Sequence, residues 1–151
     1  MTDENLNKIK ELIEEFFEKM TFPAGIESQE WEDNLLKVGL VSSEAQVLIG
    51  QQGKTLSDIQ NILAKILRKQ LSQEVFLDLD INNYKSDKKQ RFCDLAQEAA
   101  DEAISSGREK MLFPMAAFER RIIHTELAKR QDVTTESVGE GEERKVVIRP
   151  V

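Results

Sequence analysis

The sequence predicts an α+β fold made of two small domains. Several segments repeat apolar residues with the three-four spacing of a helix that packs one stripe against a core. Residues 75–81 instead alternate apolar and polar side chains, which is the pattern of a half-buried strand. Polar residues over 82–86 then form a short joint. With 151 residues, 40% of them hydrophobic, the chain can form two modest cores, expected over 1–82 and 83–151.

The first domain is expected to follow the order helix, strand, strand, helix, helix, strand. Its opening helix has an apolar stripe that includes Ile9, Ile13 and Phe17, and Pro23 and Gly25 come directly after it. Residues 54–71 repeat this pattern, with Leu56, Ile59, Ile62, Leu63, Ile66, Leu67 and Leu71 on one face. The expected ranges are a helix over 4–20, strands over 26–31 and 35–41, helices over 45–49 and 54–71, and a strand over 75–81.

The second domain is expected to pack helices on a small, mostly antiparallel sheet. Ser86 or Asp87 can cap the start of its first helix, and Gly107 fits the position just past its end. In the next helix, Phe118 and Ile122 share a face that suits the core. The expected ranges are a helix over 87–106, a short strand over 111–114, a helix over 115–129, and a hairpin from 133–137 to 146–148 around Gly139-Glu140-Gly141.

The net charge of −7, taken alone, disfavours nucleic acid, since phosphate contacts come mainly from Lys and Arg. However, residues 1–33 contain 10 acidic and 3 basic side chains, so the rest of the chain is neutral overall. A polyanion responds to local charge more than to the total. The basic stretches are Lys54, Lys65, Arg68 and Lys69, then Lys85, Lys88, Lys89 and Arg91, then Arg120, Arg121, Lys129 and Arg130.

Other classes of protein are disfavoured by composition. The single Cys93 cannot form an internal disulfide, and one Cys with one His does not predict a zinc site or a nucleophile pair. We expect no cofactor and no metal. The sequence has no apolar run long enough to span a bilayer and no signal-peptide pattern, so we expect a cytoplasmic protein that does not insert into membranes.

A glycine turn is the first candidate binding feature. Gly50, Gln51, Gln52 and Gly53 join two predicted helices, and glycine lets a sugar-phosphate backbone approach closely. The next helix begins at Lys54, so its free N–H groups and positive dipole end face that backbone. Val47, Ile49 and Ile59 could form a groove for unstacked bases. The alternative is a tight helix–helix turn with no ligand.

The context of this turn resembles the K-homology (KH) domain in its type II topology, over roughly residues 1–82. The carrying segment is Val47-Leu48-Ile49-Gly50-Gln51-Gln52-Gly53-Lys54-Thr55-Leu56. The resemblance implies that the G-x-x-G backbone grips about four nucleotides of a single strand. Many members have Lys or Arg between the glycines, where this chain has two glutamines. We therefore expect a weaker phosphate grip, dependent on Lys54, Arg68 and Lys69.

The second candidate feature is Arg120-Arg121-Ile122-Ile123-His124. Arg120 and His124 are four residues apart and so share one helical face. Both can donate to phosphate and stack on a base, and Arg121 could add a second phosphate contact. The alternative is a surface or half-buried histidine, with Arg120 paired to an acid such as Glu119.

Residues 84–151 resemble the single-strand-binding family named after its Arg-x-x-x-His motif. The match includes Pro114-Met115-Ala116-Ala117-Phe118-Glu119 before the motif and Glu136-Ser137-Val138-Gly139-Glu140-Gly141 after it. Together the two domains resemble the bacterial Jag/KhpB family, whose members often carry a further N-terminal domain that we expect to be missing here. The resemblance implies binding of single-stranded RNA and perhaps-related ssDNA, post-transcriptional regulation linked to cell elongation and division, and a KH-domain partner protein or self-association.

Two other functions remain open at this stage. One is a protein-interaction or dimerisation adaptor with weak or no RNA binding, which the acidic N-terminal segment and the neutral Gln51-Gln52 pair favour. The other is an enzyme such as a nuclease, using Asp78, Asp80 and His124. Nothing in the sequence ties those three residues together, so we expect a binding protein without catalysis.

Overall fold

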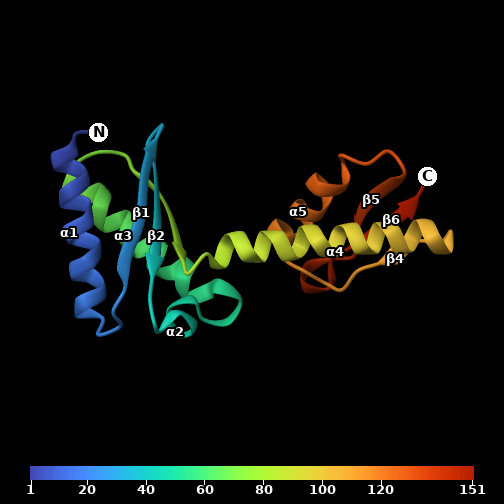
Figure 1. The fold of residues 1–151 in the computed structure, drawn as a ribbon, viewed down its shortest axis with the longest axis horizontal. Helices are drawn as coiled ribbons and strands as arrows, with labels where there is room; N and C mark the ends of the chain where they lie inside the picture. Colours follow the sequence, from blue (N-terminus) through green and yellow to red (C-terminus); the bar gives the residue numbers. More distant parts are fainter. The chain divides into compact units, whose positions relative to one another are not determined.

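The computed structural model describes all residues 1–151 and contains two compact units, Met1–Lys85 and Ser86–Val151. The division expected from the sequence was 1–82 and 83–151. The α+β class is confirmed, since both units combine helices with one small sheet (Figure 1). No helix is both long enough and apolar enough to cross a membrane.

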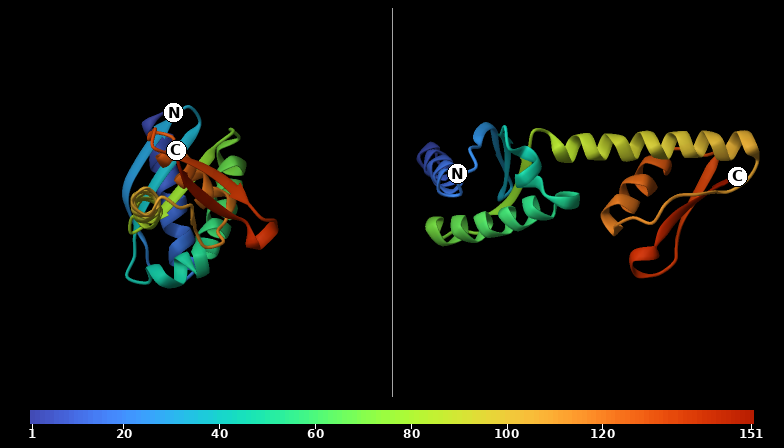
Figure 2. Two further views of the ribbon diagram at one scale, coloured as in Figure 1. Left: turned by 90° about the vertical axis from the view of Figure 1, so that its right-hand side faces the viewer. Right: turned by 90° about the horizontal axis from the view of Figure 1, so that it is seen from below.

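The first unit has the expected order of elements. Its helices and strands are α1 (Asp3–Lys19), β1 (Gly25–Glu32), β2 (Leu35–Val41), α2 (Ala45–Ile49), a 3-10 turn η1 (Gln51–Gly53), α3 (Lys54–Leu71) and β3 (Phe76–Ile81). The sheet order is β1-β2-β3, with β1 and β2 antiparallel and β2 and β3 parallel. Helices α1 and α3 lie on the same side of this sheet (Figure 2).

Alternation along the strands explains how this sheet packs. Leu36, Val38 and Leu40 of β2 are buried in the core, whereas Lys37 between them is exposed. Strand β3 does the same with Leu77, Leu79 and Ile81. The predicted helical stripe is wrong at one position: Ile62 of α3 is 50% exposed, because Ile59 and Leu63 face the core more directly.

The second unit packs two helices on an antiparallel sheet. Its elements are α4 (Tyr84–Ser106), β4 (Lys110–Met111), α5 (Ala117–Leu127), β5 (Val133–Val138), a 3-10 turn η2 (Gly141–Glu143) and β6 (Lys145–Pro150). The sheet order is β4-β6-β5, and both pairings are antiparallel. Four alanines form the core stripe of α4, and α5 contributes Ile123 and Leu127.

Helix α4 begins earlier than the sequence analysis expected. It starts at Tyr84, so Tyr84 and Lys85 belong to the first compact unit, and neither Ser86 nor Asp87 is its cap. Asp80 supplies the acceptor instead, because its Oδ1 lies 3.0 Å from the backbone nitrogen of Lys85. Asn82 and Asn83 adopt left-handed backbone conformations, which turn the chain into the helix.

Two expectations for the second unit were wrong in detail. The strand expected over 111–114 is the two-residue β4, Lys110–Met111. Phe118 was expected in the core but is 52% exposed, and Ile122 is half-buried. Ile123 and Leu127 occupy the buried face of α5, which is therefore rotated by about one residue from the face that was predicted.

Candidate nucleic-acid interface

The glycine turn between α2 and α3 has a backbone that glycine makes possible. Gly50 has φ 71° and ψ −173°, and a side chain there would overlap the hydroxyl of Thr55. Gln52 and Gly53 follow with φ 54° and 78°, so two consecutive residues are left-handed. A Cβ atom on Gly53 would lie 3.0 Å from the ring of Tyr84, which packs against the turn.

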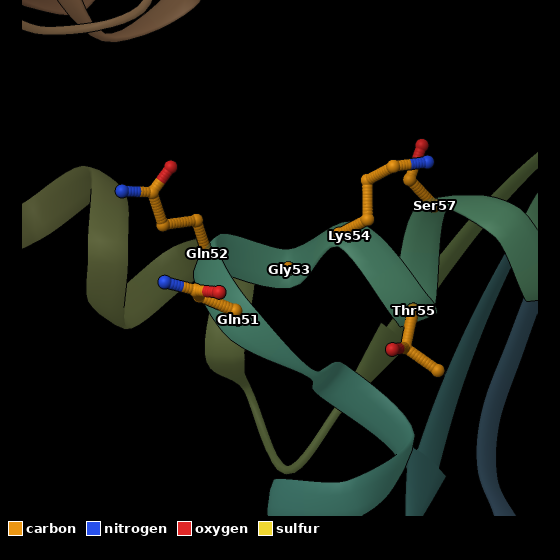
Figure 3. A pocket seen from close by; sticks show the side chains of 6 residues that line it. All are labelled: Gln51, Gln52, Gly53, Lys54, Thr55 and Ser57. Atoms are coloured by element: carbon orange, nitrogen blue, oxygen red, sulfur yellow. The ribbon is translucent and has the colours of Figure 1, made fainter.

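A pocket of about 660 Å³ opens at this turn, lined by Gln51, Gln52, Gly53, Lys54, Thr55 and Ser57. In Figure 3 the side chains of Gln52, Lys54 and Ser57 extend on the same side, and Gly53 leaves the backbone between them uncovered. Gly53 is the N-cap of α3 and offers no side-chain acceptor to the first turn of that helix. The first-turn N–H groups of an 18-residue helix therefore face this pocket without a side-chain cap.

The charge at this turn is modest. Lys54 Nζ contacts both carboxylate oxygens of Asp58 at 2.9 and 3.1 Å, and both side chains are well exposed. An exposed pair of this kind contributes only about 0–1 kcal/mol, so a phosphate could compete for Lys54. Gln51 and Gln52 are exposed and add hydrogen-bond donors without charge.

The structure corrects two expectations about this turn. Arg68 and Lys69 lie in the last turn of α3, about 20 Å from Lys54 along the helix, so they cannot reinforce phosphate binding at the turn. Arg68 donates to the carbonyl of Val75 and covers the ring of Phe76. Ile59 is only 4% exposed and belongs to the core, so it cannot line a groove beside Val47 and Ile49.

His124 of the second unit is held by β5. Its Nδ1 lies 2.7 Å from the hydroxyl of Thr135, and its Nε2 lies 2.7 Å from the hydroxyl of Ser137. Thr135 and Ser137 are two apart on a strand, so both point to the same side, toward α5. Both ring nitrogens are thus used within the protein, and His124 connects α5 to β5 rather than offering free donors to a ligand.

Two arginines flank this histidine. Burial first, and then the charges of Arg120 and Arg144, lower the pKa of His124 below its usual 6.5, so the imidazole is neutral at pH 7. Arg120 Nη1 donates to the carbonyl of Met115 at 2.7 Å, and Arg144 Nη1 donates to the carbonyl of Gly139 at 2.8 Å. Neither arginine forms an ion pair, so both keep an uncompensated charge and further N–H donors.

The alternative in which Arg120 pairs with Glu119 is wrong. Glu119 Oε1 contacts Lys88 Nζ at 3.0 Å, and its Oε2 accepts from the backbone N–H of Ala116 at the start of α5. Arg121 is exposed and also has no acidic partner. Because Glu119 already has both of these partners, Arg120 and Arg121 remain available to an external anion.

The structure also sorts the basic stretch at the start of α4. Lys85 contacts Asp78 at 2.6 Å, and Lys88 contacts Glu119, so two of its four cations are neutralised within their own unit. Lys89 and Arg91 are exposed and form no ion pair. Only this second pair can extend a basic surface.

The residues considered for a nuclease do not come together. Asp78 bonds to Lys85, Asp80 bonds to the start of α4, and His124 bonds to two hydroxyls in the other unit. No group of three or more His, Cys, Asp or Glu side chains is arranged to hold a metal ion.

Three residues of the second site were missed by the sequence analysis. Thr135 and Ser137 position His124, and Arg144 lies beside it from the far side of the β5–β6 connection. The signal for the first two was the i, i+2 spacing of hydroxyls on a strand that follows the motif. Arg144 had no such signal, because only the turn through Gly139 and η2 brings it near His124.

The family comparisons agree with this geometry. The KH domain family matches residues 8–87, which contain the glycine turn. The chain belongs to the KH domain family. The domain family named after its Arg-x-x-x-His motif matches residues 91–150, which contain Arg120, Arg144 and the His124 contacts. The chain thus carries a KH domain followed by an Arg-x-x-x-His domain, as the resemblance to the Jag/KhpB family implied.

Curated relatives carry the same two-domain region. The chain is 32% identical to the RNA-binding protein KhpB of Clostridium symbiosum over 143 residues, which is 94% of this chain and 64% of the relative. It is 34% identical over 102 residues to the protein of the same name from Lactiplantibacillus plantarum, covering 68% of this chain and 32% of the relative. For the Bacillus subtilis protein of that name, identity is 32% over 111 residues, with 72% and 53% covered. The chain therefore spans less than two thirds of the length of these relatives.

The lowered pKa of His124 makes the stability of the Arg-x-x-x-His domain depend on pH. As pH falls through about 6.5 the unfolded chain takes up a proton at His124, whereas the folded chain does so only at lower pH. The free energy of unfolding should therefore decrease across this window. Glu126 and Asp132, whose pKa values are lowered by Lys129 and Arg130 respectively, lose their contribution only at more acidic pH, below about 4.5.

Since the chain has a single His, an NMR titration of its imidazole protons measures this pKa without ambiguity. Thermal unfolding by circular dichroism at about pH 7.5 and about pH 5.5 measures the stability change. The control is His124→Gln, which can bond a hydroxyl but does not titrate and should lose most of this pH dependence. An imidazole pKa at or above 6.5 would contradict the prediction.

Proposed function

We propose that this chain binds single-stranded RNA through both domains and that the Arg-x-x-x-His domain makes the larger share of the phosphate contacts. The observation that carries this proposal is the pair of uncompensated arginines, Arg120 and Arg144, on either side of a neutral His124. Phosphate oxygens accept from guanidinium N–H groups in a short, charge-assisted geometry. The proposed contacts are Arg120 and Arg121 with Arg144, and His124 acts by holding α5 against β5.

The KH turn has a different proposed part. Gly50, Gln51, Gln52, Gly53 and Lys54 present backbone N–H groups and amide donors to the strand, with one cation that a phosphate can take from Asp58. Neutral donors hold the sugar-phosphate backbone less strongly than charged ones. The turn therefore contributes register and close approach, and it ranks below the Arg-x-x-x-His site in affinity.

The proposal is for binding without catalysis. Each residue considered for a nuclease already has a bond within the protein, and Asp78 and Asp80 belong to a different unit from His124. These bonds support a role for the three side chains in holding the fold. We place the protein in the cytoplasm as an RNA-binding regulator.

The wider role also follows the Jag/KhpB resemblance. We propose post-transcriptional regulation linked to cell elongation and division, together with a KH-domain partner protein or self-association. Light scattering separates these forms, since a monomer that still binds RNA would exclude obligate self-association. The adaptor alternative predicts instead that folded protein has no affinity for RNA.

The test of RNA binding is a titration of a fluorescein-labelled single-stranded RNA of about 16 nucleotides, long enough to reach both sites. We expect saturable binding that weakens as salt rises, with a negative slope of about 0.7 per phosphate contact in a plot of log affinity against log salt. The matching duplex and a single-stranded DNA of the same sequence measure selectivity. A folded sample without affinity for any single strand at low salt would refute the proposal.

A further inference from the structure

One aromatic side chain of the Arg-x-x-x-His domain lies outside its core and has not been assigned a role above. Phe118, in the first turn of α5, is 52% exposed. It contributes less to the core than Ile123 or Leu127, which are almost fully buried on the same helix. An exposed large apolar side chain needs no explanation alone, so its surroundings decide its meaning.

Those surroundings hold the ring in place. Lys88 Nζ lies 5.5 Å from the centre of the Phe118 ring, and the same ammonium contacts Glu119 Oε1 at 3.0 Å. The Lys88 and Glu119 side chains are only 15% and 14% exposed, so this pair is largely removed from water. Glu119 is fixed in turn by the backbone N–H of Ala116. A cation anchored in this way restrains one side of the ring and leaves the exposed part of Phe118 open to solvent.

The surface next to Phe118 is cationic. Arg121 follows it by three residues, so the two side chains lie on one face of α5, and Arg121 is exposed without an acidic partner. Thr125, four residues further, continues this exposed face. The face differs from the one that contains Arg120 and His124, which turns toward Met115 and β5. The domain thus has a flat aromatic group beside an uncompensated guanidinium.

We propose that Phe118 is a stacking platform for an unpaired base of the bound strand, with Arg121 on the phosphate of that nucleotide. The proposal rests on the RNA binding proposed above and assigns part of it to a second face of α5. Every base has a π-face, so such a platform accepts all four bases and adds affinity without sequence preference. The local positive charge favours a nucleotide over an apolar protein surface at this position.

The chain offers a closely matched control. Phe76 of β3 is 49% exposed and also has a cation over its ring, since the Arg68 guanidinium carbon lies 5.5 Å from its centre. It lies near the C-terminal end of α3, about 20 Å along that helix from the glycine turn, and is assigned no role in binding. Phe76→Ala therefore removes an equally exposed ring without touching either proposed site.

The experiment measures affinity for the labelled single-stranded RNA with Phe118→Ala, Phe118→Leu, Phe118→Trp and Phe76→Ala. We expect Phe118→Ala and Phe118→Leu to weaken binding roughly 5- to 150-fold, the range for loss of one stacked base, and Phe118→Trp to retain it. Phe76→Ala should bind as the unaltered protein does. Thermal unfolding of each variant checks that the protein remains folded.

A second probe separates stacking from general loss of contact. An RNA with the same sugar-phosphate backbone but abasic positions should bind the unaltered protein more weakly, while Phe118→Ala should lose little further affinity. In Phe118→Trp, combined with Trp31→Phe to remove the only native tryptophan, RNA should quench the indole fluorescence.

The outcomes are distinguishable. If the unaltered protein binds no RNA, the proposed function fails and the platform with it. If it binds RNA and Phe118→Ala binds equally well, the platform alone fails. If Phe118→Leu keeps full affinity, or if Phe118→Ala changes self-association and leaves RNA affinity unchanged, the exposed ring is an apolar protein contact and the inference is overturned.

Discussion

Replacing Arg120 and Arg144 together by alanine should weaken RNA binding by about 100-fold, since each charge-assisted contact contributes about 1.5 kcal/mol. The two guanidinium groups flank His124 and have no acidic partner, so their removal deletes uncompensated charge without leaving a carboxylate unpaired. The slope of log affinity against log salt should become shallower by about 1.4, because two phosphate contacts are lost from a single strand.

The choice of Arg144 rather than His124 as the second position matters. His124→Ala would break the bonds to Thr135 and Ser137, and a lost affinity could then come from a displaced α5. The histidine serves better as a reporter. Bound phosphate should offset the charges of Arg120 and Arg144, so saturating RNA should raise the pKa of His124, and the double variant should not show this rise.

The matched control removes the same charge elsewhere. Arg108 and Lys69 are exposed and form no ion pair, and neither lies in a proposed site. Alanine at both should lower affinity far less than the Arg120 and Arg144 change. Gln51→Asp with Gln52→Asp, which adds two negative charges at the exposed KH turn, tests the ranking of the two domains. If this pair of aspartates reduced affinity more than the arginine variant, the KH turn would be the main phosphate site.

Gly50→Ala should destabilise the KH domain by about 3 kcal/mol. Its φ of 71° with ψ of −173° belongs to a region that is essentially restricted to glycine, and strain of this kind costs about 1–3 kcal/mol. The added methyl group would also overlap the Thr55 hydroxyl and come within 3.1 Å of the Thr55 backbone nitrogen, which the turn cannot easily move.

Urea unfolding followed by Trp31 fluorescence measures this effect, because the single tryptophan lies in β1 of the same domain and packs against its core. Gly25→Ala is the control, since a Cβ atom there would meet nothing within 4 Å and its φ is not left-handed. It should change the unfolding midpoint very little. Equal midpoints for Gly50→Ala and the unaltered protein would show that the turn is not built as described.

The sequence predicted helices and strands well where burial follows one period. The alternation through Leu77 and Leu79 of β3 and the apolar stripe of α1 were sufficient, because each of these elements buries a single face. Prediction was less accurate where a partner outside the element decides the local structure. The start of α4 depends on Asp80, which lies in β3 and accepts from the backbone of Lys85, and no capping pattern at Ser86 or Asp87 could reveal it.

The candidate site shows the same division. The motif itself located Arg120 and His124, but the roles of these residues depend on which groups face them. Phe118 was assigned to the core because aromatic residues at helical spacing usually pack inside, and the rotation of α5 about Ile123 reversed this assignment. The hydroxyls of Thr135 and Ser137 could satisfy the imidazole only once β5 was placed beside α5.

The short span of the contacts around His124 has a consequence for how this site forms during folding. His124 and Thr135 are 11 residues apart, and Gly139 and Arg144 are only 5 apart, so the unfolded chain closes small loops to bring them together. In the KH domain, by contrast, parallel pairing joins Leu35 to Phe76 across the whole of α2 and α3. Loop-closure entropy and contact order both make such distant pairing slower to nucleate. The proposed arginine site is therefore assembled from local chain, and it can become competent without waiting for the long-range closure that shapes the glycine turn.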